Sequence, residues 1–124
     1  MFRFDGENWE LAGKIPEATQ TYGFAVHRGS LYVSEWRKAR VFRYAGGTQW
    51  DDVGKLGQEL EAMPILVYNG KMYGGTLPSA EVYRYDGDIN WTKIGGVDAT
   101  PDVKYRRAWS MAVFQGRLFV GTLP

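Results

Sequence analysis

The 124-residue sequence contains no cysteine and a single histidine. Without cysteine the chain has no disulfide framework, no thiolate zinc site and no cysteine nucleophile, and one histidine excludes a multi-histidine metal cluster within the chain. The longest strongly apolar run, residues 62–68, is far shorter than the ~20 residues of a membrane-spanning helix, and the first residues lack the apolar core of a secretory signal. We therefore expect no metal, no other cofactor and no membrane partner.

The sequence also lacks an excess of charge and any recognisable catalytic motif. Fifteen Lys and Arg residues against 14 Asp and Glu residues give a net charge of +1, whereas nucleic-acid-binding proteins carry strongly basic surfaces. The chain has no phosphate-binding loop, no dinucleotide fingerprint, no serine nucleophile motif and no paired-carboxylate motif. We expect no nucleic-acid partner and a non-catalytic role, and the sequence does not specify a compartment.

Glycine and aromatic residues are abundant instead, and they recur at a regular interval. The chain has 16 glycines, five tryptophans, eight tyrosines and six phenylalanines. Trp9, Trp50 and Trp91 lie 41 residues apart, and each follows a short segment with Arg between two aromatic residues. A second series of similar segments occupies residues 25–33, 66–74 and 112–120. The sequence therefore contains an internal repeat of about 41 residues, with a longer connection before the last unit.

Each repeat is predicted to form four short β-strands. The apolar runs are brief, rich in aromatic and β-branched residues, and bounded by Gly, Asn, Asp or Pro. In the best-defined repeat we predict strands over residues 64–68, 71–75, 81–86 and 91–94. Asn69-Gly70 between the first two is a favoured two-residue hairpin turn. The predicted fold class is all-β, built from four-stranded antiparallel units.

Four-stranded repeats of this length are typical of the blades of a β-propeller. The most specific signatures of the repeat are Gly74-Gly75, Tyr85-Asp86, Trp91 and Arg106-Arg107. Together they resemble the kelch repeat family, in which Tyr-Asp ends one strand, Trp follows, Arg precedes the innermost strand, and a glycine doublet follows the second strand. The resemblance covers the whole chain in general pattern and implies a β-propeller that binds a ligand or another protein.

The phase of the repeat predicts how the blades are divided. We expect complete blades at residues 22–54 and 63–95, the third and fourth strands of a blade at 1–13, and the first and second strands at 106–124. Three blades' worth of strands do not close a ring, because propellers contain about four to eight blades. We therefore predict a homodimer in which the half blades of two copies complete each other in a six-bladed ring. The alternative is a fragment of a longer propeller protein.

Candidate ligand-binding residues lie on the connections between strands, outside the repeated pattern. In a four-stranded meander, the connections from the second to the third strand and from blade to blade emerge on one face. The candidates on this face are Tyr22, Glu35, Trp36, Arg37, Tyr105, Arg106 and Trp109. Aromatic and charged side chains of this kind bind carbohydrate or another small polar ligand, and they are also frequent at protein interfaces. We expect the first role. A protein-interaction scaffold, or a solvated loop with Trp36 packed on its own blade, is the alternative.

The repeated residues, in contrast, are interpreted as structural. We expect the three tryptophans to pack between blades and not to stack on sugars. The three arginines at one repeat position, Arg3, Arg43 and Arg84, are expected to stack on tryptophan or to pair with carboxylates of the neighbouring strand, such as Glu10 and Asp51. His27 occupies the position of Tyr68 in the next repeat, so we interpret it as a packing residue of an innermost strand. Two copies of it across a dimer channel would make a poor metal site.

Overall fold

The computed structural model describes all residues 1–124, and it is all-β, with 65% of the residues in strands and no helix. The predicted fold class is confirmed at this level. The strands are β1 (Phe2–Phe4), β2 (Trp9–Leu11), β3 (Gln20–His27), β4 (Ser30–Trp36), β5 (Arg40–Gly46), β6 (Gln49–Lys55), β7 (Glu61–Tyr68), β8 (Lys71–Leu77), β9 (Glu81–Gly87), β10 (Asn90–Gly96), β11 (Arg107–Phe114) and β12 (Arg117–Leu123).

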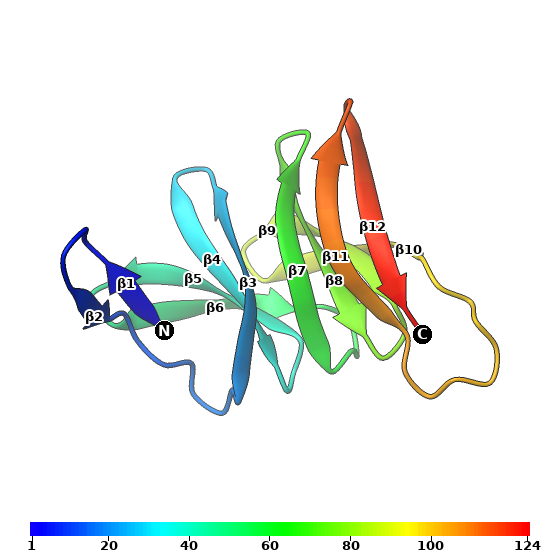
Figure 1. Cartoon of the computed structure of the whole chain (residues 1–124), viewed down its shortest axis with the longest axis horizontal. Helices are drawn as coiled ribbons and strands as arrows, with labels where there is room; N and C mark the ends of the chain where they lie inside the picture. The colour runs from blue at the N-terminus through cyan, green and yellow to red at the C-terminus, as the bar shows by residue number, and fades with distance from the viewer.

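The strands form two four-stranded antiparallel meanders flanked by two hairpins. In each of the sets β3 to β6 and β7 to β10, every strand pairs with the next along the chain. One pairing, Trp36 of β4 with Glu61 of β7, joins the two meanders into a curled sheet. The pairs β1–β2 and β11–β12 form separate two-stranded sheets at opposite sides of the molecule (Figure 1). The four strands predicted in the best-defined repeat are confirmed as β7 to β10.

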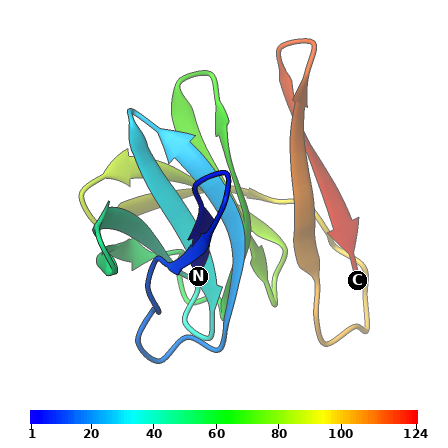
Figure 2. The ribbon, with the colours of Figure 1, turned by 60° about the vertical axis from the view of Figure 1, so that its left-hand side comes forward.

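The strand ends define two ends of the molecule. The tips of the β3–β4, β7–β8 and β11–β12 hairpins point to the same end, and the connections that lead into β3, β7 and β11 lie at the other end (Figure 1). The β11–β12 hairpin stands at one side of the molecule, after the long connection that follows β10 (Figure 2). Residues at the same repeat position therefore occur at equivalent heights along this row of hairpins.

Aromatic packing repeats with the sequence. Three ring pairs at one repeat position have centroids 4.9–5.0 Å apart: Phe4–Trp9, Tyr44–Trp50 and Tyr85–Trp91. The indole Nε1 of Trp50 donates to the Ala12 carbonyl at 2.8 Å. The indole Nε1 of Trp91 donates to the Val53 carbonyl at 2.9 Å. The packing interpretation is confirmed for Trp50 and Trp91, since each ties its own unit to the preceding one, whereas Trp9 is 68% exposed.

Each of the three repeated arginines forms an ion pair with a carboxylate. The predicted pairing with the neighbouring strand is confirmed for Arg3 and Arg43, whereas Arg84 pairs with Asp86 of its own strand, β9. The pairs are Arg3–Glu10 at 3.0 Å, Arg43–Asp51 at 3.5 Å and Arg84–Asp86 at 2.7 Å. Because these side chains are largely exposed, each pair contributes little stability.

The glycine doublet permits close contact between β8 and β11. A Cβ atom on Gly75 would lie 2.8 Å from both the Cβ and the carbonyl oxygen of Ala108. At the same repeat position on β4, Ser34 uses its hydroxyl to donate to the Met63 carbonyl of β7 at 2.6 Å. Neighbouring units are thus joined at this position either by a contact that only glycine allows or by a buried hydrogen bond.

Candidate functional site

Two hollows lie on the face where the connections between strands meet. One has a volume of about 200 Å³ and is lined by Trp36, Leu60, Glu61, Leu77, Tyr105 and Arg107. The other has a volume of about 320 Å³ and is lined by Tyr22, Gly23, Met63, Pro64 and Trp109. A hydrogen bond of 2.8 Å joins the walls of the two, from the Tyr22 hydroxyl to Glu61 Oε2. We refer to the two hollows together as the loop-face groove.

The polar part of the groove comes from the first residues of the innermost strands. Gln20, Glu61 and Arg107 begin β3, β7 and β11 at the same repeat position. The Tyr22 hydroxyl lies 2.8 Å from both Gln20 Oε1 and Glu61 Oε2, so it donates to either acceptor. An amide, a carboxylate and a guanidinium are thus placed at equivalent points of three successive units, next to one phenol.

The Tyr22 phenol is held in its neutral form. Burial is the main cause that raises its pKa above the ordinary value, and the hydrogen bond to Glu61 and the charge of that carboxylate raise it further. The positive charge of Arg107 acts in the opposite direction. Tyr22 therefore remains a hydrogen-bond donor at neutral pH.

The aromatic walls of the groove carry cations on their rings. Trp36 ends β4, and the guanidinium carbon of Arg37 lies 5.9 Å from its ring centroid. Tyr105 lies on the connection before β11, with Lys104 Nζ at 5.0 Å and the Arg107 guanidinium carbon at 5.8 Å from its ring centroid. The two cations beside Tyr105 surround that ring with positive charge, whereas the exposed Arg37 lies at the outer limit of such a contact with Trp36.

The structure brings together four of the predicted residues in the groove: Trp36 and Tyr105 in one hollow, Tyr22 and Trp109 in the other. Arg37 contacts Trp36 but lines neither hollow. Sequence reasoning missed Glu61 and placed Arg107 second to Arg106. The signal that points to both is the change of residue type from Gln20 to Glu61 to Arg107 at a position where a purely structural repeat would keep one type.

The expectation that Glu35 contacts ligand is wrong. Its side chain is fully buried on β4, and Oε1 accepts hydrogen bonds from the backbone N–H groups of Lys38 and Arg40 at 3.1 and 2.9 Å. The Arg40 guanidinium adds an ion pair of 3.2 Å. Glu35 therefore closes the connection between β4 and β5, as Thr76 does for the next unit through its hydrogen bonds with Glu81.

The predicted residue Arg106 does not line the groove. Arg106 Nε donates to the Thr100 carbonyl at 2.8 Å, and its backbone N–H donates to the Pro78 carbonyl at 2.8 Å. These bonds hold the long connection against the turn that precedes β9. Because alternate side chains of a strand point to opposite sides, Arg107 and not Arg106 enters the groove.

Comparison with known proteins adds no assignment to this geometry. No protein-family model matches the chain, and no curated protein sequence matches it. No three His, Asp or Glu side chains converge on one point in the manner of a metal site, and the structure has no helix suited to crossing a membrane. The groove is therefore interpreted from its own residues.

Proposed function

We propose that this chain is one half of a kelch-like, six-bladed β-propeller and acts as a non-catalytic binding module for carbohydrate or another small polar ligand. The observation that carries the proposal is the convergence of Trp36 and Tyr105 with Glu61 and Arg107 in one hollow. These residues come from three separate segments of the chain, the end of β4, the start of β7 and the stretch leading into β11, and packing of the sheets does not require all of them in one place.

The chemistry of the groove suits a hydroxylated ring. The apolar C–H face of a sugar packs on aromatic rings such as Trp36 and Tyr105, while a carboxylate and a guanidinium each bind two neighbouring hydroxyls. The groove contains one carboxylate, Glu61, whereas glycoside hydrolysis ordinarily uses two at a set separation. The residues therefore favour recognition of a sugar over its cleavage.

Free strand edges support the second copy in this proposal. β4 and β8 pair with neighbours on both sides, but their counterpart β12 pairs only with β11. β5 and β9 likewise pair on both sides, but their counterpart β1 pairs only with β2. β12 lacks the strand that would follow it in a complete unit, and β1 lacks the strand that would precede it. Pairing of β12 of one copy with β1 of another would supply both missing neighbours.

The side chains at these edges support the same arrangement. Phe2 of β1 is 66% exposed, whereas the residues at the same repeat position, Phe42 and Tyr83, are 4% and 6% exposed. Phe42 packs against Ile15 and against Val33 of β4, the inner strand for which β1 has no counterpart beside it. An aromatic face left in water is an association surface, and the buried counterparts define which surface would cover it.

The binding proposal is tested with the Trp36→Ala variant. We expect the unmodified chain to bind members of a panel of mono- and oligosaccharides on a glycan array, and calorimetry with the best-binding glycan to show at least tenfold weaker binding for Trp36→Ala. Arg37→Ala is the matched control, because Arg37 is adjacent in sequence and lines neither hollow. Circular dichroism and the measured mass should be the same for all three proteins.

Two outcomes would contradict a glycan-binding groove. One is the absence of any bound glycan together with capture of a protein partner, which would favour the interaction scaffold. The other is glycan binding that Trp36→Ala and Arg37→Ala weaken equally, which would place the ligand elsewhere on the molecule.

A further inference from the structure

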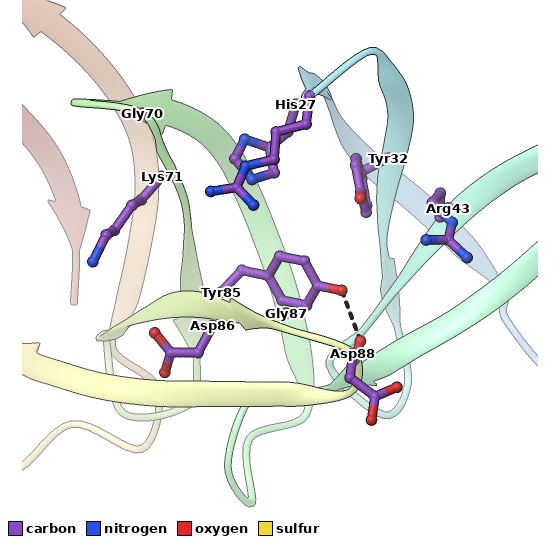
Figure 3. Close-up of a pocket in the computed structure, with 10 residues that line it drawn as sticks. His27, Tyr32, Arg43, Gly70, Lys71, Tyr85, Asp86, Gly87 and Asp88 are labelled. Atoms are coloured by element: carbon purple, nitrogen blue, oxygen red, sulfur yellow. Dashed lines mark hydrogen bonds between the residues drawn. The ribbon is translucent and has the colours of Figure 1, made fainter.

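A second cavity lies at the opposite end of the molecule, near the tips of the β3–β4 and β7–β8 hairpins. It has a volume of about 440 Å³, within the range of small-molecule sites. His27, Tyr32 and Tyr85 meet around its centre (Figure 3). The centroid separations are 6.2 Å for His27–Tyr32, 6.5 Å for His27–Tyr85 and 6.0 Å for Tyr32–Tyr85. We refer to it as the His27 pocket.

Histidine occupies a repeat position in this pocket at which the next unit has tyrosine. In the next unit, the Tyr68 hydroxyl reaches across to the neighbouring hairpin and donates to the Gly116 carbonyl at 2.8 Å. The counterpart of Gly116 is Gly70, which lines the His27 pocket, and the imidazole makes no hydrogen bond within the chain. The His27 side chain is shorter than a tyrosine, so the space between it and Gly70 stays open, whereas the Tyr68 phenol spans the corresponding space to Gly116.

The free charge in the pocket is mainly positive. Arg28 and Lys71 line it and form no ion pair, and Arg43 adds a third cation that is paired with Asp51 at 3.5 Å. Of the two acids in the lining, Asp86 is paired with Arg84 at 2.7 Å, which leaves the exposed Asp88. Two unpaired cations beside three aromatic rings favour a ligand with one anionic group.

We propose that the His27 pocket binds a small organic anion, with a carboxylate or phosphate group held by Arg28 and Lys71 and a body of monosaccharide size packed against the rings of His27, Tyr32 and Tyr85. Both walls of the pocket come from one chain, so this site does not depend on the loop-face groove or on a second copy.

The repeat itself supplies variants that remove the site and preserve the fold. His27→Tyr introduces the residue found at position 68. Arg28→Asn introduces the residue at position 69, which has nearly the same left-handed backbone, with φ of 49° against 48°. Lys71→Ser introduces the residue at position 30. Each introduced residue occurs at the same repeat position of the other complete unit, although no strand there takes the place of β9, whose Tyr85 lies beside His27.

Calorimetric titration with glucuronate and with glucose 6-phosphate tests the proposal, and glucose is the neutral control. We expect at least one anion to bind the unmodified chain, glucose to bind at least tenfold more weakly, and Arg28→Asn and Lys71→Ser each to weaken anion binding about tenfold or more, as for the loss of a charge-assisted hydrogen bond. His27→Tyr should abolish binding with an unchanged melting temperature. The two anions distinguish a carboxylate site from a phosphate site.

The proposal is overturned if neither anion binds, if glucose binds as well as the anions, or if a folded His27→Tyr variant binds them as tightly as the unmodified chain does. None of these results would affect the glycan proposal for the groove, because Trp36→Ala and Arg37→Ala test that site separately.

Discussion

Trp9 gives the sharpest prediction of the assembly proposal, because it is 68% exposed in one chain and becomes buried in the proposed ring. Trp50 and Trp91 donate to carbonyls of the preceding unit, and the repeat assigns the Ile94 carbonyl of the other copy to Trp9. For a lone chain, Trp9→Ala would cost about 1 kcal/mol or less, including the lost stacking on Phe4. At an interface, truncating a buried tryptophan costs about 3–5 kcal/mol.

Each site therefore loses at least about 2 kcal/mol more in the dimer than in the lone chain. Since the proposed dimer contains two such interfaces, Trp9→Ala should raise its dissociation constant by at least about three orders of magnitude. Sedimentation equilibrium over a dilution series measures this change. Val26→Ala is the control, because Val26 is 67% exposed but lies on an innermost strand away from the terminal hairpins. If Trp9→Ala and Val26→Ala have the same mass at every concentration, the proposed burial of Trp9 is refuted.

The remaining predictions concern packing and pH. Gly75→Ala should destabilise the fold by about 1–3 kcal/mol in urea unfolding, because its Cβ would lie 2.8 Å from Ala108. Gly95→Ala, which meets no atom within 4 Å, should cost far less, and equal losses would contradict the contact. Burial lowers the pKa of His27, and the charge of Arg28 lowers it further, so the folded chain binds this proton less readily than the unfolded chain does. The stability of the fold should therefore decrease as the pH falls below ~6.5, because protonation of His27 favours the unfolded chain. Urea midpoints measured over this pH range should show that His27→Tyr lacks this part of the pH dependence.

The strand pattern of this fold is readable from sequence because each signal is local. Asn69-Gly70 predicts the turn between β7 and β8, and the structure gives Asn69 the left-handed backbone that this turn requires. The strands themselves extend further than predicted, as β7 begins at Glu61 and not at residue 64. Strand ends depend on pairing partners such as Trp36 of β4, which lie far away in sequence.

The candidate site is only partly predictable because it depends on side-chain direction. Sequence reasoning finds Trp36 and Tyr105, since large aromatic residues on irregular connections stand out from a repeat. It does not decide between Arg106 and Arg107, because one residue of register reverses the side to which each points. Glu35 misleads for a similar reason: a charged residue suggests a surface, and only the structure shows its hydrogen bonds to the backbone of the following connection.

Light scattering after size exclusion, over a dilution series, measures the absolute mass of the 124-residue chain and so shows directly whether two copies form one ring. We expect a single species of about 28 kDa, twice the 14.1 kDa of one chain, that persists on dilution and is lost on Trp9→Ala. A stable species of 14.1 kDa at every concentration would contradict the claim that two copies complete one ring.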